Sequence, residues 1–344
     1  ERHVPNHVKK DFRARLDFFV HSVREALVTG GFAGRQVILA LPAASMFIGH
    51  LRLAKMEGQT LTQSLAWEIR GKIPIEPAQA VLRHLIAGEV FVDQEPRDEI
   101  IVLASRKEVV DGLLESAKKA RLDVVGMNVE MGAIVDCFSN VYRRKTDADA
   151  TNCFVEIGSI GTRVIVSRGG HILFARGIPV GASELDTTIA KELRMDLEAA
   201  AARRRQLAAK TADEPALVAA GAEVGAAFGE ERRRDLRDAD DDPANHEING
   251  VYATVAEKLV EELTLCRRYY ESTFPGRQVD RLIFVGGGAS DRKLCQEIAR
   301  GMGLPAQVGD PLVRVEGRHL LDGEGKKPHP AWAVAVGLSA GGVT

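Results

Sequence analysis

Two glycine-rich turns constrain the possible fold of this chain more than any other feature of its sequence. The first is Gly-Ser-Ile-Gly-Thr at 158–162, between apolar runs that are typical of the two strands of a hairpin. The second is Gly286-Gly287-Gly288, which follows an apolar run at 282–285 and precedes a helical pattern. Glycine lets backbone amides approach an anion closely, and a helix start attracts negative charge. Each turn is therefore a candidate phosphate site.

The side chains around the first turn suit a phosphate and its cation. Ser159 and Thr162 can donate hydroxyl hydrogen bonds, and Glu156 can hold a hydrated divalent cation. Taken alone, Gly-Ser-x-Gly-Thr is also an ordinary hairpin turn. The second turn does not match G-x-x-x-x-G-K-[ST], so the sequence gives no support for a Walker-type phosphate loop.

Length and composition indicate a globular protein with more than one structural unit. The chain has 344 residues, 45% of them hydrophobic and 27% charged, so it can bury a large core. The net charge of -2 gives no bulk electrostatic reason to bind nucleic acid or an anionic membrane. No stretch approaches the ~18 consecutive apolar residues of a membrane helix. We therefore expect a cytoplasmic protein with no nucleic-acid partner and no membrane span.

The cysteines and tryptophans are expected in the core. The cysteines form no CxxC pair and lack metal-ligand spacing, which predicts reduced, buried thiols. They are Cys137, Cys153, Cys266 and Cys295. Trp67 and Trp332 fall on apolar helix faces and are expected to pack there. The nine histidines show no metal-binding pattern.

Hydrophobic periodicity predicts alternating strands and helices. Strands are expected at 37–41, 46–53, 81–92, 99–104, 122–129, 152–157, 161–167, 171–178, 281–285 and 305–308. Helices are expected at 9–28, 61–69, 107–120, 132–142, 183–193, 248–270, 291–302 and 330–339. Ser105 is expected to cap the third of these helices, and Gly169-Gly170 to form a hairpin turn.

The pairing of a strand-hairpin turn with a later strand-Gly-Gly-Gly-helix resembles the actin, heat-shock chaperone and sugar-kinase superfamily. Within it, the chain is most similar to the PilM family of type IV pilus assembly proteins, which are related to FtsA and to the cytoplasmic domain of the secretion protein GspL. The resemblance covers most of the chain. It is carried by the segments 37–42, 73–74, 122–130, 174–181, 280–289, 303–308 and 329–338.

The resemblance implies an α/β fold of the actin-like ATPase (ribonuclease H-like) type, with two lobes and an inserted small α+β subdomain. We expect five segments along the chain. They are an N-terminal helix of the first lobe at 1–36, the partner-binding subdomain at 37–130, the phosphate-hairpin region at 131–194, an Ala-, Arg- and Asp-rich helical or partly disordered insertion at 195–247, and the second lobe with the Gly-Gly-Gly turn at 248–344.

The resemblance also implies a nucleotide site for ATP and Mg²⁺. Nucleotide phosphates would lie at Gly158, Ser159, Gly161 and Thr162, adenine and ribose at Gly286, Gly287, Gly288 and Ala289, and the metal at Glu156. No catalytic residue is assigned. The superfamily commonly has Asp where this chain has Glu156, and relatives have Ala-Glu-x-x-Lys where it has residues 198–204. The first phosphate loop has no match, as expected if the native start is missing. These departures predict weak or no ATPase activity.

The implied partner is the cytoplasmic tail of a PilN-like inner-membrane pilus protein, docked on the 37–130 subdomain. Other pilus components would bind too, and the protein would be cytoplasmic and held at the inner membrane by its partners. One alternative is the cytoplasmic domain of a GspL-like type II secretion protein. A sugar or metabolite kinase of the same fold and a filament-forming cell-division relative are further alternatives. A kinase needs a carboxylate base, and no Asp in a matching context was found between residues 103 and 151.

Overall fold

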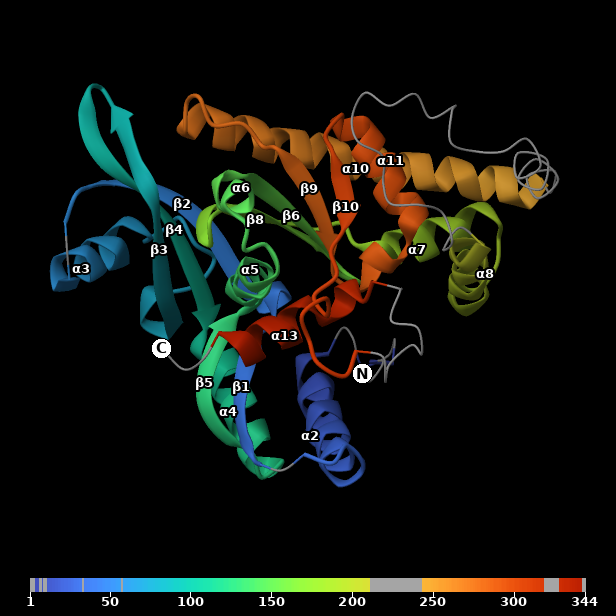
Figure 1. Ribbon diagram of the computed structural model, residues 1–344. Coiled ribbons are helices and arrows are strands. Elements are labelled where there is room, and N and C mark those ends of the chain that lie inside the picture. Colours follow the sequence, from blue (N-terminus) through green and yellow to red (C-terminus); the bar gives the residue numbers. More distant parts are fainter. Residues whose placement is uncertain are drawn as a thin grey trace.

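A five-stranded mixed sheet forms the centre of the molecule, with helices on both faces (Figure 1). The computed structural model describes residues 4–5, 8, 11–32, 34–56, 58–210, 243–318 and 328–341. The strand order is β10-β9-β6-β7-β8, with bounds β6 (Thr151–Ile157), β7 (Thr162–Arg168), β8 (His171–Ile178), β9 (Arg281–Val285) and β10 (Ala306–Val308). Helices α10 (Pro243–Thr273) and α11 (Arg292–Met302) cover one face, and α5 (Glu130–Val141) covers the other.

Coverage of both faces explains the continuous apolar character of the central strands. Every residue of β6 is buried. Phe154 of β6 packs on Phe138 of α5, with ring centroids 5.2 Å apart. Between β7 and β8, Gly169 and Gly170 have φ values of 53° and 89°, as a two-residue hairpin turn requires. The predicted strands and glycine hairpin of this region are confirmed.

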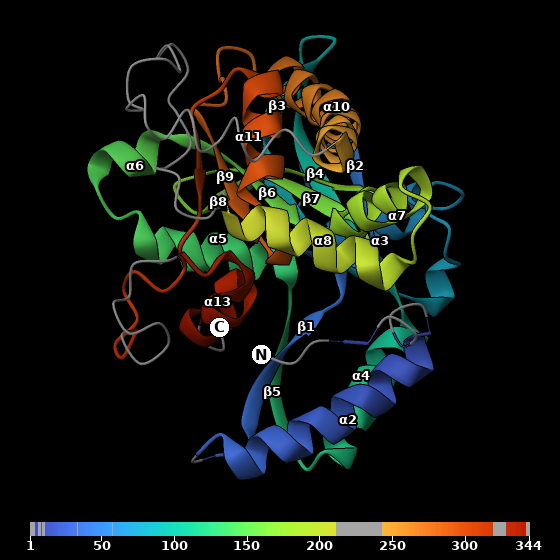
Figure 2. The same ribbon diagram turned by 90° about the vertical axis from the view of Figure 1, so that its right-hand side faces the viewer.

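A smaller unit projects from this body and contains a two-stranded parallel sheet with two helices (Figures 1 and 2). Its elements are α2 (Phe12–Thr29), β1 (Gln36–Leu41), α4 (Lys107–Lys119) and β5 (Asp123–Val129). Asp11 caps α2 by accepting hydrogen bonds from the amides of Arg13 (2.8 Å) and Ala14 (3.2 Å). Phe12 and Leu16 of α2 pack in one apolar cluster with residues of β1, α4 and β5. The helix predicted from residue 9 thus begins after its cap.

A three-stranded antiparallel sheet of order β2-β4-β3 lies against the edge strand β8 of the central sheet. Its elements are β2 (Met46–Ala54), β3 (Ala80–Val92) and β4 (Glu95–Arg106), with α3 (Gly58–Glu68) on its outer face. In β4, Ile100 and Val102 pack in the small core beneath α3. The alternate residues Ile101 and Leu103 belong to the main core. Strand β4 is therefore buried on both faces, as its sequence predicted.

One buried carboxylate joins the three-stranded sheet to the body. Glu99 of β4 accepts hydrogen bonds from His50 Nδ1 (3.0 Å), Arg52 Nε (2.9 Å) and the Tyr269 hydroxyl of α10 (2.9 Å). Arg52 also reaches the Thr273 hydroxyl at 3.1 Å. Burial raises the pKa of Glu99, but its hydrogen bonds to His50, Arg52 and Tyr269 outweigh burial and keep the pKa below its ordinary value. Glu99 is thus a charged anchor between two units.

The predicted helix cap at Ser105 is wrong. Strand β4 continues through Arg106, which is the residue before α4, and no side chain caps that helix. The Ser105 hydroxyl instead donates to the carbonyl oxygen of Ser45 at 3.0 Å. Continued pairing with β2 and β3 on either side holds Ser105 in the sheet, which places it one residue too early to act as a cap.

The two tryptophans do not share one environment. Trp67 is 69% exposed, so the prediction that it packs in the core is wrong. In α3 the buried positions are Leu61, Leu65 and Ile69 beyond its end, and Trp67 points away from that stripe. Trp332 is half-buried. All four cysteines are buried free thiols, as predicted.

The remaining elements complete the two lobes. They are α6 (Lys145–Asp149), α7 (Ala182–Glu192), α8 (Leu197–Lys210), α13 (Ala333–Ala340) and the short 3-10 turns at Ala43–Ser45, Pro77–Gln79, Gly287–Ser290 and Pro330–Trp332. The polar stretch after α5 contains the one-turn helix α6. Of the expected insertion at 195–247, α8 and the start of α10 are described, and 211–242 lie outside the described residues. The expected domain boundaries stay a prediction.

Helices α5 and α13 cross at very close range. A Cβ atom on Gly337 of α13 would overlap the backbone carbonyl oxygen of Ala133 in α5. Both residues are buried, and the obstacle is main chain that cannot rotate away. Only glycine therefore permits this crossing. By contrast, a Cβ on Gly250 of α10 would meet nothing within 4 Å.

We predict that Gly337→Ala lowers the free energy of unfolding by about 2–3 kcal/mol, because α5 and α13 must separate to admit a methyl group. Gly250→Ala is the matched control, since it makes the same change in an open helical position. It should leave stability unchanged or raise it by up to about 1 kcal/mol through better helix propensity. Urea denaturation followed by circular dichroism measures both. Equal stabilities for the two variants would contradict the close crossing.

Candidate functional site

The two glycine turns meet at one end of the central sheet. Strands β6 and β9 are parallel neighbours, with Glu156 paired to Val285, so the turns that follow them lie side by side. Gly286 has φ 84°, and a Cβ there would lie 2.7 Å from the carbonyl oxygen of Ile157. A Cβ on Gly288 would overlap the Ile157 side chain. The structure thus brings together the two groups of residues that the sequence predicted as a site.

Most of the glycines in this site are explained by packing of the protein against itself. A Cβ on Gly158 would lie 2.8 Å from the Gly161 carbonyl oxygen, and a Cβ on Gly161 would lie 3.0 Å from that of Ile178. Gly287 differs, because it is exposed and a Cβ there would meet nothing within 4 Å. Gly287 is therefore the position in the Gly-Gly-Gly turn that leaves open space for a ligand.

The first residues of α7 and Val180 just before it hold the first turn in place. The amides of Ala182 and Ser183 donate to the carbonyl oxygens of Gly158 and Ser159, each at 2.9 Å. The Thr162 hydroxyl donates to the carbonyl oxygen of Val180 at 2.7 Å. The hydroxyl of Thr162 is thus already used, while Ser159 stays exposed at the tip of the turn. The predicted phosphate residues are assembled, but their hydrogen-bonding capacity is partly taken.

Glu156, the residue predicted to hold a cation, forms an ion pair with Arg163. The two residues lie opposite each other across the β6–β7 hairpin. Both Nε and Nη2 of Arg163 donate to the Glu156 carboxylate, one to each oxygen. Glu130, the first residue of α5, places Oε2 at 3.4 Å from Arg163 Nε. One guanidinium therefore serves two carboxylates beside the glycine turns.

Burial affects the third member of this cluster most strongly. Burial raises the pKa of Glu130 to about 7, Arg163 opposes that rise, and the charge of Glu156 adds to it. Glu130 Oε2 also accepts a hydrogen bond from the Ala43 amide at 3.3 Å. The cluster is therefore close to neutral near pH 7 and contains no uncommitted carboxylate. A divalent cation at Glu156 would have to displace Arg163, so these residues do not fit a metal as they stand.

A second buried polar network follows the Gly-Gly-Gly turn and was not predicted. Asp291 caps α11 and is only 3% exposed. It accepts hydrogen bonds from Tyr252 of α10 at 2.7 Å and from Arg204 Nη1 of α8 at 3.0 Å. Arg204 also pairs with Asp186 of α7 at 2.6 Å. Burial raises the pKa of Tyr252, helped by Asp291. This network ties three helices to the second turn.

Sequence signals for these unpredicted residues differ in strength. Arg163 was detectable, because Glu156 and Arg163 stand at matched positions on either side of a hairpin turn. Asp291 was detectable only as a helix cap. Its partners Tyr252 and Arg204 lie 39 and 87 residues away in the sequence, and no local pattern predicts such contacts.

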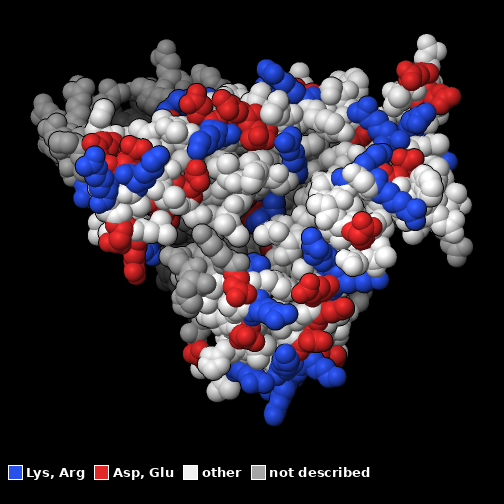
Figure 3. Space-filling model, turned by 180° about the vertical axis from the view of Figure 1, so that it is seen from behind, with Lys and Arg blue, Asp and Glu red and all other residues white. Residues whose placement is uncertain are grey.

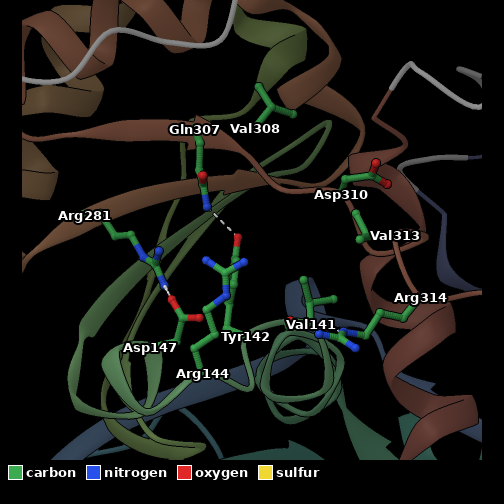
Figure 4. A pocket seen from close by; sticks show the side chains of 10 residues that line it. All are labelled: Val141, Tyr142, Arg144, Asp147, Arg281, Gln307, Val308, Asp310, Val313 and Arg314. Atoms are coloured by element: carbon green, nitrogen blue, oxygen red, sulfur yellow. Dashed lines mark hydrogen bonds and ion pairs between the residues drawn. The ribbon is translucent and has the colours of Figure 1, made fainter.

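The hollow drawn in Figure 4 is a separate feature, of about 470 Å³, and no predicted site residue lines it. Arg281, at the start of β9, pairs with Asp147 at 3.1 Å and stacks over Tyr142, 4.5 Å from its ring centre. Gln307 donates to the Tyr142 hydroxyl at 2.5 Å. Arg281 is thus paired with Asp147, and Gln307 with Tyr142. We therefore assign the hollow a structural role beside β10.

The surface carries charges of both signs. On the face seen in Figure 3, basic and acidic side chains are interspersed. Among the helices of the described residues, none is both long and apolar enough to cross a membrane. Within the same residues there is no group of three His, Cys, Asp or Glu side chains that could hold a metal ion.

The fold is of the actin-like ATPase type. A search of curated proteins gave no match. The sequence model of the family described as type IV pilus assembly protein PilM matches residues 5–213, which is more than half of the chain. The chain therefore belongs to the PilM family of type IV pilus assembly proteins.

Among solved structures, the chain is similar to a PilM-PilN type IV pilus biogenesis complex, at 20% identity and a TM-score of 0.76, over 100% of this chain and 90% of that one. MreB 5 of Spiroplasma citri bound to AMPPNP matches at 15% identity and TM-score 0.41, over 68% and 63%. The cytoplasmic domain of EpsL from the type II secretion system of Vibrio cholerae matches at 15% and 0.35, over 52% and 63%. The last two likenesses are too weak to argue from.

We predict that Glu130→Gln stabilises the protein at pH 8 and not at pH 4. The folded protein retains the Glu130 proton up to about pH 7, whereas the unfolded chain releases it near pH 4.5. Stability is therefore lost as the pH rises from about 4.5 to 7, and the loss persists above 7. Glutamine removes this titration, so the gain at pH 8 should be of the order of 1–3 kcal/mol. Denaturation curves at both pH values measure the difference in the free energy of unfolding between the variant and the wild-type protein. A difference of equal size at pH 4 and pH 8 would contradict the prediction.

Proposed function

We propose that this protein is a scaffold of type IV pilus assembly that binds the cytoplasmic tail of a PilN-like inner-membrane protein. The observation that carries the proposal is family membership over residues 5–213, joined to a shared fold with PilM in a PilM-PilN complex. In this proposal the protein is cytoplasmic and is held at the inner membrane by its partners. Other components of the pilus machinery would dock on the same scaffold.

We place the partner surface on the three-stranded sheet and α3, inside the predicted 37–130 subdomain. A cleft of about 540 Å³ lies between β2 and α3. Its lining combines the apolar side chains of Leu53, Met56 and Trp67 with two guanidinium groups, of Arg52 and Arg97, and one carboxylate, of Glu68. An exposed tryptophan beside a cleft with basic groups suits a short segment with apolar and acidic side chains. The exposure of Trp67 is the main support for this surface.

We further propose an adenine nucleotide at the paired glycine turns, with phosphates at residues 158–162 and the nucleoside at 286–289. The open space at Gly287 supports this placement. The proposed role of the nucleotide is to set the arrangement of the two lobes, which requires contacts that differ between two arrangements. Turnover is not part of the proposal, because no residue is assigned to activate a water and both nearby carboxylates are engaged by Arg163.

We predict that Trp67→Ala weakens binding of a synthetic peptide from the cytoplasmic tail of the host PilN-like protein by about ten-fold or more. The variant should remain folded, because the lost side chain is 69% exposed. Phe32→Ala is the control, since Phe32 is 66% exposed but lies beyond α2 on the other small unit. Calorimetric titration measures all three proteins. Equal losses of peptide affinity in both variants, or no loss in either, would exclude the cleft beside α3 as the binding site.

We predict that Gly287→Val abolishes binding of a fluorescent adenine nucleotide while leaving folding and peptide affinity unchanged. A Cβ at this position would meet nothing within 4 Å, so a branched side chain would occupy space that is open at this turn. Fluorescence anisotropy with the intact protein measures nucleotide affinity, and thermal melting tests the fold. Unchanged nucleotide affinity in the variant would move the site elsewhere. A wild-type protein that binds peptide but no nucleotide would leave the scaffold proposal standing and remove the nucleotide.

A further inference from the structure

Arg163 stands where the family resemblance predicted a metal ion. The sheet register places it directly opposite Glu156, one strand away, so their pairing follows from the hairpin itself. Its guanidinium binds both oxygens of Glu156 and lies near Glu130 as well. A divalent cation would use the same carboxylate oxygens as ligands. The guanidinium and a metal therefore compete for one place.

The guanidinium also reaches the phosphate turn. A Cβ on Gly158 would lie 3.3 Å from Nη2 and 3.7 Å from Nη1 of Arg163. The bonds to Glu156 come from Nε and Nη2, so Nη1 donates no hydrogen bond within the described part of the chain. Arginine presents its donors as a planar fork that matches phosphate oxygens. One edge of Arg163 thus holds the carboxylates, and the other edge is available beside the turn.

The charges of the cluster favour the same interpretation. A nucleotide polyphosphate carries several negative charges and would be repelled by Glu156 and Glu130 without a cation between them. Arg163 is always charged and is fixed in that position by the fold. Burial also raises the pKa of Glu130 to about 7, which lowers the negative charge of the cluster near neutral pH.

We propose that Arg163 is a built-in counter-ion that replaces the divalent cation, so that nucleotide phosphates bind at the hairpin turn without magnesium. This inference rests on the nucleotide site in the proposed function and adds its chemistry. The ligand class is a nucleoside di- or triphosphate free of metal. Glu156 and Glu130 then act as positioning residues for the guanidinium.

The first experiment measures the affinity of a fluorescent ADP analogue for the intact protein in EDTA and in excess Mg²⁺. The dissociation constants should agree within about two-fold. A much tighter complex in Mg²⁺ would overturn the inference while supporting the nucleotide site. Absence of nucleotide binding in both buffers would overturn both this inference and the nucleotide site. The peptide titration would still test the scaffold proposal separately.

The second experiment removes the guanidinium. Arg163→Met leaves the carboxylates of Glu156 and Glu130 without the arginine that they share. This variant should bind nucleotide about ten-fold or more weakly in EDTA, and Mg²⁺ should restore its affinity. It should also bind free Mn²⁺, detected by electron paramagnetic resonance without nucleotide, whereas the wild-type protein should not. Arg176→Met is the control, because it removes an exposed arginine from neighbouring β8 and should change neither property.

Two further variants keep the test decisive if Arg163→Met does not fold. Arg163→Lys keeps the charge and loses the fork, so it should bind nucleotide more weakly but still independently of Mg²⁺. Arg163→Met combined with Glu156→Gln removes both the guanidinium and the carboxylate that would bind a metal. This double variant should bind no nucleotide in either buffer. If a folded Arg163→Met variant keeps wild-type affinity in EDTA, the ion pair is structural only and the inference fails.

Discussion

The parallel pairing of β6 with β9 is the interaction on which the candidate site depends. Parallel neighbours end at the same edge of a sheet, so the turns after Ile157 and Val285 must lie together. The other end of the pair is closed by reciprocal bonds: the Thr151 amide donates to the Asp280 carboxylate at 2.7 Å, and the Asp280 amide donates to the Thr151 carbonyl oxygen at 3.0 Å. A slip of one residue would turn Glu156 to the opposite face of the sheet. The register thus positions both the glycine turns and the ion cluster.

Burial of β6 on both faces then determines the chemistry beside the turns. A carboxylate enclosed by helices cannot remain charged without a partner, because its removal from water costs several kcal/mol. In this chain the partner of Glu156 is Arg163 on the adjacent strand, within the same hairpin. A residue of the protein therefore meets an electrostatic need that a bound metal could otherwise meet. Burial raises the pKa of Glu130 to about 7, because the more distant guanidinium of Arg163 offsets only part of that effect.

The sequence allowed most of the architecture to be predicted, because each central strand and helix carries its own local pattern. The hairpin at Gly169-Gly170 and the apolar run of β4 are such local signals, and both were confirmed. Predictions failed where a neighbouring element decided the outcome. Ser105 was read as a cap, but pairing with β2 and β3 holds it in the sheet. Trp67 was read as a core residue, although the stripe of α3 that packs inward lies on another side of the helix.

The sequence indicated two glycine turns that lie together in the structure, but it did not indicate the ion pairs beside them. Glycine turns after apolar strands are visible in the sequence, and the role of these turns in nucleotide binding stays a prediction. The partner of each charged group depends on tertiary contacts. Arg204 and Tyr252 converge on Asp291 from two different helices, which no spacing rule predicts. Glu156 shows the consequence, since the sequence suggested a metal ligand and the structure pairs this carboxylate with Arg163.

Helix α10 connects the proposed partner surface to the candidate site. Near one end, Tyr269 and Thr273 contact Glu99 and Arg52, and Arg52 lines the cleft beside α3. Toward the other end, Tyr252 holds Asp291, which follows the Gly-Gly-Gly turn. In the proposed function, a bound tail that draws Arg52 toward the cleft would remove a positive charge from beside Glu99. The packing of α10 against Glu99 would then change. In our proposal that change reaches the Gly-Gly-Gly turn, because the same helix carries Tyr252, whose hydroxyl bonds to Asp291. Such a connection transmits a signal only when both ends have two arrangements.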